Sequence, residues 1–499
     1  MSWHRSALAA ALALAALPLG PAAAAAAPAG GTGDPVYPSL GTTAYDALAY
    51  DLAFTYRPAT RTVDGTTVLT ARALTRTAEL ELDALGLDVH AVRVDGRPAG
   101  FRAHDEKLTV LPARPVRAGT VLRVEVEYTA DPRATLPHTG WVVTPDGFAV
   151  AGQPDGAHTV FPCNDRPGDK ARFTIAVTAP DDLLGVANGL PTSTEPHADG
   201  TTTRRYAVRE PMATELLQAS VGRYTVRERR GPQGQPLRDV VPTARAADLE
   251  PALALTPGQL AWAEQHLGRY PFETYGLLPA DTDDPQAFGF TGLETQTLTL
   301  YKPNFLRQPE PLIGSHMMHE LVHSWFGNSV TPGTWADLWL NEGHADFYGL
   351  TYRYERGWPD SGGSTTLTDR MRRVYAQGDQ WRHDSGPVAV PTAATLFDSQ
   401  RYTGGTLVLF ALRELVGPEV FDRIERAFLR RHRHGTATTA DFLRTAAEVS
   451  GQPLDGFLRE WLYGERTPPM PGHPDWTVDP VDPDAARRPG GVPRGSGTL

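Results

Sequence analysis

Cysteine is almost absent from this chain of 499 residues, in which Cys163 is the only one. A single thiol excludes an internal disulfide, and it also excludes a metal site built from several cysteines. The fold must therefore be stabilised by its apolar core. Any metal ion should be bound by histidine and carboxylate side chains.

A sustained basic stripe is also missing, and the formal net charge is -11 at pH 7. This balance argues against nucleic acid as the main partner. One short basic cluster lies at residues 430–434. It is better explained as the solvated C-terminal end of a helix, where cations interact favourably with the helix dipole.

Long apolar runs are lacking everywhere except near the N-terminus. There, His4 and Arg5 precede an apolar run from Ala7 to Leu19, and small residues follow as far as Ala27. The run is too short and too rich in alanine for a membrane anchor, so it predicts a secretory signal peptide over residues 1–27. We therefore expect a protein that is secreted or held in the cell envelope, without stable membrane insertion.

The length predicts two or three domains. Short runs that alternate apolar and polar residues favour an antiparallel sheet in the first part of the chain, and apolar residues at helical spacing follow beyond it. Gly/Pro-rich stretches separate and flank these parts. The predicted organisation is a flexible N-terminus at 28–43, a β domain at 44–230, a linker at 231–244, a mostly helical domain at 245–466 and a disordered tail at 467–499.

Local patterns predict where several elements begin and end. Asp64-Gly65 indicates a turn between strands. Thr256 is predicted to cap a helix that has proline at its first position. Apolar residues from Leu312 to Phe326 predict a helix that ends at Gly327. Thr438-x-x-Asp441 has the pattern of a capping box.

The stretch His319-Glu320-Leu321-Val322-His323 lies in one of these predicted helices. Residues four apart share a helix face, so both imidazoles can reach one cation. Glu320 is offset beside them and is placed to accept a proton from water activated by the metal. A third ligand must come from elsewhere, and Glu342 is the candidate. The alternative, two core histidines on an apolar helix, would bury Glu320 without a cation and is disfavoured.

Residues 151–173 interrupt the strand pattern with three prolines and many polar side chains. A structured polar loop of this kind is a candidate for the wall of a site. An ordinary turn-rich connection is the simpler interpretation of this stretch taken alone.

Four stretches between roughly residues 45 and 465 together resemble the aminopeptidase N family of zinc metallopeptidases, which includes leukotriene hydrolase. The His319-Glu320-x-x-His323 motif, eighteen residues and then Glu342 fit the family's zinc signature. The segment Phe290 to Gln296 resembles its exopeptidase motif, with Glu294 in the carboxylate position. Tyr402 falls where the family keeps its catalytic tyrosine. Gln153-Pro154-Asp155 resembles the loop that helps to hold the substrate amine.

The resemblance implies a multi-domain α+β fold. A saddle-like N-terminal antiparallel β-sheet domain would be followed by a mostly helical, thermolysin-like zinc peptidase domain. We expect a short member of the family, without the large helical C-terminal domain of longer members.

The resemblance also implies the chemistry. One Zn²⁺ ion would be bound by His319, His323 and Glu342, with Glu320 as general base and Tyr402 as hydrogen-bond donor to the oxyanion.

The implied substrates are peptides with a free N-terminus. Glu294, helped by Gln153 and Asp155, would pair with the substrate ammonium and fix its distance from the metal. The expected activity is therefore that of a secreted zinc aminopeptidase. A thermolysin-like zinc endopeptidase and a non-catalytic peptide-binding homologue are the alternatives, disfavoured by Glu294 and Glu320 respectively.

Asp346 lies one helical turn after Glu342 on the same face. It could accept the second ring proton of a zinc-bound histidine, or it could be an ordinary surface aspartate.

The sequence departs from the family pattern at several positions. Thr291, Leu293 and Thr295 replace the Gly, Met and Asn of the exopeptidase motif, and Gly404 stands where a basic residue is common. His344 replaces the commoner Phe, as it tends to do in the leukotriene hydrolase branch. One residue does not establish a second, epoxide-hydrolysing activity.

Overall fold

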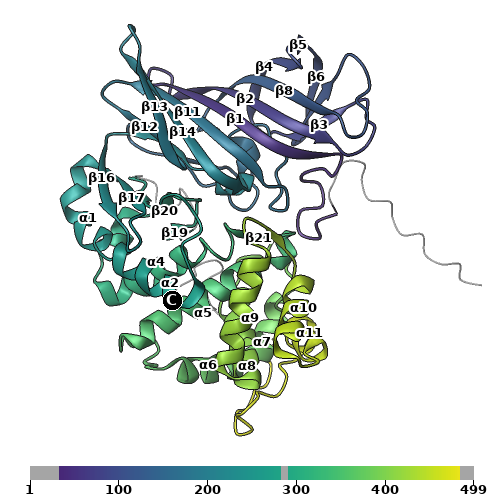
Figure 1. The fold of residues 1–499 in the computed structure, drawn as a ribbon, viewed down its shortest axis with the longest axis vertical. Coiled ribbons are helices and arrows are strands. Elements are labelled where there is room, and N and C mark those ends of the chain that lie inside the picture. The colour runs from purple at the N-terminus through teal and green to yellow at the C-terminus, as the bar shows by residue number, and fades with distance from the viewer. Residues whose placement is uncertain (1–32, 282–289, 484–499) are drawn as a thin grey trace, which may run out of the picture.

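The computed structural model describes residues 33–281 and 290–483. The predicted signal peptide, residues 1–27, lies outside the described residues, as does the end of the predicted tail from 484 onward. Among the described helices, none has the length and apolar character needed to cross a membrane. The fold is a mixed α+β arrangement in which a β-rich N-terminal domain sits on a mostly helical domain (Figure 1).

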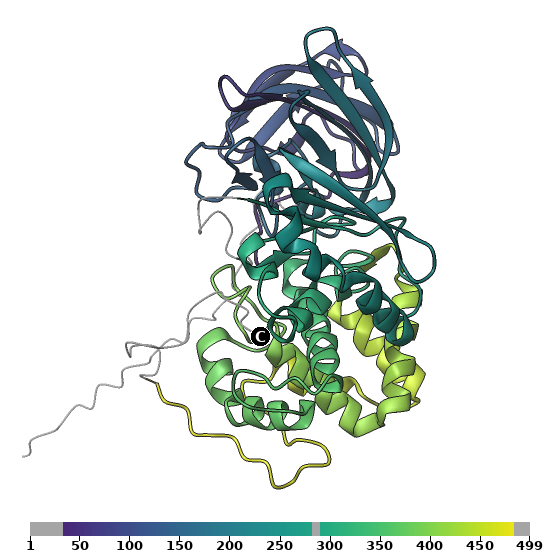
Figure 2. The same cartoon turned by 90° about the vertical axis from the view of Figure 1, so that its left-hand side faces the viewer.

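The N-terminal domain is built on a twisted sheet, seen from a second side in Figure 2. The sheet has eight strands in the order β13-β14-β11-β1-β2-β8-β4-β5. Its neighbouring strands are antiparallel except for the parallel pair β1 and β11. The strand bounds are β1 Tyr45–Arg57, β2 Thr62–Ala73, β4 Leu87–Val94, β5 Arg97–Pro98, β8 Val121–Ala130, β11 Ala171–Pro180, β13 Leu190–Pro196 and β14 Thr201–Met212.

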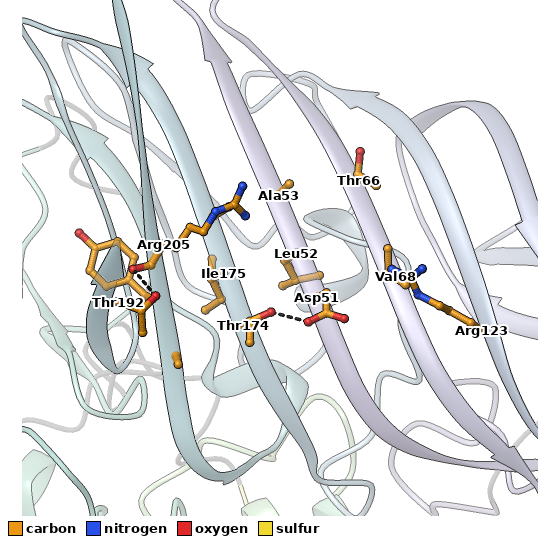
Figure 3. A pocket seen from close by; sticks show the side chains of 13 residues that line it. Asp51, Leu52, Ala53, Thr66, Val68, Arg123, Thr174, Ile175, Thr192 and Arg205 are labelled. Carbon is orange, nitrogen blue, oxygen red and sulfur yellow. Dashed lines mark hydrogen bonds between the residues drawn. The ribbon is translucent and has the colours of Figure 1, made fainter. Parts of the chain in front are cut away.

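The alternation in β1 explains why this sheet has one buried face. Tyr50, Leu52 and Phe54 point into the core, whereas Asp51 and Ala53 between them are exposed. Such period-two burial is the signature of a sheet with one solvated face. On that open face the strands enclose a shallow hollow of about 490 Å³, in which Thr174 donates a hydrogen bond to Asp51 (Figure 3).

Two smaller sheets contribute to the same core, which lies against the buried face of the large sheet. Their orders are β12-β15-β10-β9 and β3-β7-β6. The bounds are β3 Leu80–Asp83, β6 Gly100–His104, β7 Lys107–Leu111, β9 Trp141–Val143, β10 Phe148–Val150, β12 Leu184–Ala187 and β15 Ala219–Gly222.

The turn predicted at Asp64-Gly65 is wrong, because both residues lie inside β2. The chain turns earlier, at residues 58–61, where Arg61 has a positive φ of 57°. Gly65 is needed for space: a Cβ there would lie 2.2 Å from the ring of Tyr128, whose hydroxyl donates to the carbonyl of Val160.

The segment predicted as a linker, residues 231–244, is folded. Strands β16 (Tyr224–Arg230) and β17 (Pro236–Pro242) form an antiparallel hairpin, and residues 231–235 are its turn. Leu237 and Val241 of β17 pack into the core of the helical domain, whereas Val240 packs into the core of the N-terminal domain. Side chains on the two faces of β17 therefore pack into different cores, so this one strand connects them.

A second, three-stranded sheet of order β18-β20-β19 also lies between the two cores. Its bounds are β18 Leu277–Pro279, β19 Gly292–Leu293 and β20 Thr299–Tyr301. Leu278, Leu293 and Leu300 belong to the N-terminal core, and Leu277 and Tyr301 belong to the helical core.

The helical domain surrounds α4 and α5. Its helices are α1 Ala246–Leu253, α2 Thr256–Leu267, α3 Pro303–Leu306, α4 Glu310–Val322, α5 Trp339–Glu355, α6 Leu367–Ala376, α7 Gly378–Ser385, α8 Thr403–Val416, α9 Pro418–Arg431, α10 Thr439–Ser450 and α11 Asp455–Tyr463. A short parallel pair, β21 Val330–Pro332 and β22 Gly435–Ala437, completes it.

The predicted helix ends are partly confirmed. The capping box of Thr438 and Asp441 is present at the start of α10. Thr256 does not cap α2, because it is the first helical residue and Leu255 is the N-cap. Helix α4 ends at Val322 and not at Phe326. The chain leaves it in a tight turn that closes at Gly327, whose φ of 129° favours glycine.

The described parts of both predicted flexible ends are packed on the domains, contrary to the prediction. Near the N-terminus, Val36 is buried and Asp34 accepts a hydrogen bond from the backbone N–H of Trp335 at 2.8 Å. Beyond residue 467, Trp476 is buried and stacks on Phe410, with ring centroids 6.0 Å apart. Composition indicated loops here, but the aromatic contacts hold them in place.

Candidate metal centre and active site

Glycines at two helix crossings bring the candidate site together. A Cβ on Gly349 of α5 would lie 2.9 Å from the carbonyl oxygen of Ser315 and 3.4 Å from Cβ of His319, so the absence of a side chain lets α5 approach α4 closely. Gly343 of α5 and Gly405 of α8 meet in the same way, since a Cβ on Gly405 would lie 2.9 Å from the Cα of Gly343.

The three predicted ligands converge as expected. Nε2 of His319 and Nε2 of His323 are 3.1 Å apart, and Oε2 of Glu342 lies 3.3 and 3.4 Å from them. Ligand atoms at about 2.05 Å from a tetrahedral zinc ion are separated by about 3.3 Å. All three residues are buried, and Oε2 of Glu342 has no hydrogen-bond partner among the described residues. These donors therefore fit one zinc ion with an open fourth position.

The charges at the site are strongly coupled. Burial alone would raise the pKa of Glu342, but the adjacent side chains of His323 and His319 lower it to about 2. Glu342 is therefore a carboxylate at neutral pH, the form that binds a cation.

The other ring nitrogen of each histidine has an oxygen beside it. Nδ1 of His323 donates to the carbonyl of Phe326 at 3.1 Å. Nδ1 of His319 lies 3.6 Å from Oδ1 of Asp346, whose Oδ2 accepts a hydrogen bond from Thr403 at 2.9 Å. Asp346 is buried and is no surface residue. Its position agrees with the predicted role of orienting the metal-binding ring.

Glu320 lies beside the ligand pair. Its Oε1 is 3.3 Å from Nε2 of His316, and that nitrogen is 2.6 Å from the hydroxyl of Thr291. Burial raises the pKa of Glu320 to about 8, while His319 and His323 oppose the shift. A divalent cation at the site would lower that pKa further.

Glu294 follows β19 and is buried within 3.9 Å of Nδ1 of His323. Its Oε1 accepts a hydrogen bond from Nε2 of Gln153 at 2.7 Å, which crosses between the two domains. Its backbone carbonyl accepts another from Nδ2 of Asn328 at 2.7 Å. The structure thus brings Glu294 and Gln153 together next to the metal ligands, as the resemblance implied.

Asp155 points to a different neighbour. Its Oδ2 lies 3.7 Å from Nδ1 of His138, within the N-terminal domain. The role of Asp155 in holding the substrate amine stays a prediction.

Tyr402 is the N-cap residue of α8, and its ring stacks on that of His319 with centroids 5.9 Å apart. Burial and then the charges of Glu342, Glu294 and Glu320 raise the pKa of Tyr402. The hydroxyl is therefore protonated and able to donate a hydrogen bond.

His344 does not contribute to this group of side chains. It is buried in the helical core, with Nδ1 2.7 Å from the carbonyl of Leu340 and Nε2 3.1 Å from Glu425. Its ring stacks on Phe326.

Sequence reasoning missed three contributors: His316, Asn328 and the carbonyl of Phe326. His316 precedes Glu320 by four residues, a spacing that could have predicted its contact. Asn328 and Phe326 act from the irregular turn after α4, where no periodic pattern indicates which groups face the site.

Two family models match the chain. Residues 46–216 match the peptidase M1 N-terminal domain, and residues 252–461 match the peptidase family M1 domain. Mouse glutamyl aminopeptidase is 29% identical over 325 residues, which cover 62% of this chain and 33% of that protein. Leukotriene A-4 hydrolase of Xenopus laevis is 27% identical over 451 residues. The match covers 82% of this chain and 70% of that protein. This chain thus spans about a third of the length of the glutamyl aminopeptidases that it matches.

Solved structures agree with this match. A mutant M1 zinc metallopeptidase of Deinococcus radiodurans, bound to a Tyr-Ser-Ala substrate, superposes with a TM-score of 0.76 and 28% identity. The match covers 89% of this chain and 100% of that one. Both domain matches, the shared fold and the zinc-ligand geometry agree. The chain therefore belongs to peptidase family M1.

Proposed function

We propose that this chain is a zinc-dependent aminopeptidase that hydrolyses the N-terminal peptide bond of peptides. The observation that carries the proposal is the buried carboxylate of Glu294, held by Gln153 within 3.9 Å of a metal-binding histidine. A fixed negative charge beside the metal fits a substrate ammonium, and an internal peptide bond has no such charge. A Tyr-Ser-Ala substrate in the related metallopeptidase supports peptides as the substrate class.

When bound by His319, His323 and Glu342, zinc supplies a Lewis acid that lowers the pKa of water to about 7 and polarises a carbonyl. Asp346 and the carbonyl of Phe326 hold the two imidazole rings in orientation.

Glu320 accepts the proton of the attacking water at its carboxylate and passes it to the departing amine. The contact with His316 holds this carboxylate in place. The hydroxyl of Tyr402 donates a hydrogen bond to the oxyanion that forms on the former carbonyl. Glu294 keeps the substrate N-terminus at a set distance, so that the first peptide bond meets Glu320 and Tyr402.

The test compares substrates that differ only in a blocked amine. The expected result is turnover of free aminoacyl and peptide substrates, loss of turnover on N-acetylated ones, and loss and recovery of activity when zinc is removed and restored. Efficient cleavage of N-acetylated peptides would instead indicate a zinc endopeptidase. Zinc binding without turnover of any peptide would indicate a non-catalytic peptide-binding homologue.

We also propose that the protein is exported, on the strength of the signal-peptide pattern at residues 1–27. N-terminal sequencing of protein recovered outside the cytoplasm should find a mature end near residue 28. Recovery of only the uncleaved chain inside the cell would contradict export.

A further inference from the structure

A second group of histidine and carboxylate side chains lies in the N-terminal domain. Glu106 comes from the turn between β6 and β7, His138 from the loop between β8 and β9, and His158 from the 3-10 turn Ala157–Thr159. Nε2 of His138 and Nε2 of His158 are 3.5 Å apart; the first lies 3.9 Å from Oε1 of Glu106 and the second 3.9 Å from its Oε2. Three separate segments thus gather one ring nitrogen of each histidine and a carboxylate oxygen of Glu106, all within 4.8 Å of one another.

His158 is oriented as a metal ligand would be. Its side chain is 0% exposed, and Nδ1 lies 2.7 Å from Oδ2 of Asp165. The carboxylate of Asp165 is itself fixed by the backbone N–H of His158 at 3.1 Å and by the hydroxyl of Thr214 at 2.9 Å. A proton on Nδ1 directs the lone pair of Nε2 toward His138 and Glu106.

His138 repeats this arrangement. Its Nδ1 lies 3.7 Å from Oδ2 of Asp155, while its Nε2 faces the cluster. Each histidine therefore has a carboxylate beside one ring nitrogen and the shared point beside the other. Metal-binding histidines in proteins are commonly held in this way.

The spacing is wider than in the catalytic site: the histidine nitrogens are 3.5 Å apart instead of 3.1 Å, and they approach different oxygens of Glu106. Binding one ion would therefore require Glu106 or His138 to shift. His138 and Glu106 are 24% and 36% exposed and come from a loop and a turn. His158 supplies the rigid side of the site.

The surrounding charge favours a cation. Burial by itself would lower the pKa of His158, but the hydrogen bond to Asp165 and the charges of Asp165, Asp83 and Glu106 raise it above its ordinary value. The same carboxylates that favour a proton on this ring favour a divalent ion in its place.

We propose that Glu106, His138 and His158 form a second zinc site, separate from the catalytic one. Two imidazoles and one carboxylate are a donor set that suits zinc. The ion would join the β6–β7 turn to the loop that carries His138. Through Asp155 it would also steady the segment that presents Gln153 to Glu294. The proposal does not depend on the enzymatic activity.

The experiment measures zinc stoichiometry on the metal-stripped full chain, by equilibrium dialysis and elemental analysis near neutral pH. The wild type should bind two zinc ions. His138→Ala and His319→Ala should each bind one, and the double variant none. His90→Ala is the matched control and should still bind two, because His90 hydrogen-bonds to Thr129 and belongs to no candidate metal group among the described residues.

Glu106→Gln gives an independent readout if His138→Ala fails to fold by circular dichroism. It should weaken the second binding step at least tenfold while leaving the first unchanged. A wild type that binds one zinc ion would overturn the proposal. So would a second ion whose affinity is the same in Glu106→Gln. Either result would mean that the cluster is only a hydrogen-bonded contact between His138 and His158.

Discussion

Replacing Glu294 by glutamine tests the proposed recognition of the substrate amine most directly. The amide has nearly the same shape as the carboxylate, and its oxygen can still accept the 2.7 Å hydrogen bond from Gln153. What is lost is the negative charge beside His323. A hydrogen bond to a charged group is worth about 1.5–3 kcal/mol. We therefore expect kcat/KM on free aminoacyl substrates to fall about 10- to 100-fold.

The same variant should retain zinc, since the ligands His319, His323 and Glu342 are all unchanged. Zinc content, kcat and KM would be measured for wild type, Glu294→Gln and the control Glu310→Gln, whose side chain is exposed at the start of α4. Residual activity on N-acetylated substrates should be unchanged in all three. Equal losses on free and blocked substrates would refute the reasoning, because the missing charge would then act on something other than the amine.

Four further changes have defined outcomes. Glu320→Gln should lower kcat by about 10²- to 10⁴-fold with zinc still bound, and near-normal turnover would exclude its role as base. Tyr402→Phe should lower kcat by about 10²- to 10³-fold with little change in KM, and an unchanged kcat in a folded variant would exclude oxyanion stabilisation. Gly349→Ala should lower the free energy of unfolding by about 1–3 kcal/mol and weaken zinc binding, since its Cβ would lie 2.9 Å from the carbonyl oxygen of Ser315. Denaturant unfolding and zinc titration measure these two effects. Neither effect would be seen if α4 and α5 can separate freely. Glu215 is buried, its Oε2 has no hydrogen-bond partner within residues 33–281 and 290–483, and burial raises its pKa to about 8. The protonated side chain therefore contributes fully to the free energy of unfolding below pH 4.5, and this contribution is lost as the pH rises to 8. The free energy of unfolding of Glu215→Gln, relative to that of the wild type, should be higher at pH 8 than at pH 5 by a few kcal/mol. A difference between the two proteins that does not change with pH would refute this.

The sequence predicts those parts of the site in which the chemistry requires a fixed spacing of residues along the chain. Two histidines four apart on a helix must share a face, so the positions of His319 and His323 followed from the motif alone. Glu342 could be named only as a candidate third ligand, and Glu294 and Gln153 required the family resemblance, because their approach depends on helix crossings and a domain contact. The spacing does not reveal that Gly349 and Gly405 make those crossings close enough.

The errors share a physical cause. Gly65 has turn chemistry, but the ring of Tyr128 packs against it within a strand. The Gly/Pro-rich ends have the composition of loops, but Trp476 finds an aromatic surface on Phe410. The free energy that local propensity contributes is small compared with that of burying a large side chain. Burial depends on partners that in some cases lie hundreds of residues away in the sequence.

The strands between the two cores have a consequence for how a substrate is selected. Because β17 and the β18-β20-β19 sheet contribute side chains to both cores, they couple the two domains, which should unfold in a single cooperative transition. Gln153 of one domain and Glu294 beside the zinc ligands of the other are joined by a hydrogen bond of 2.7 Å. A peptide would therefore bind at a contact between the two domains that is already formed before it arrives.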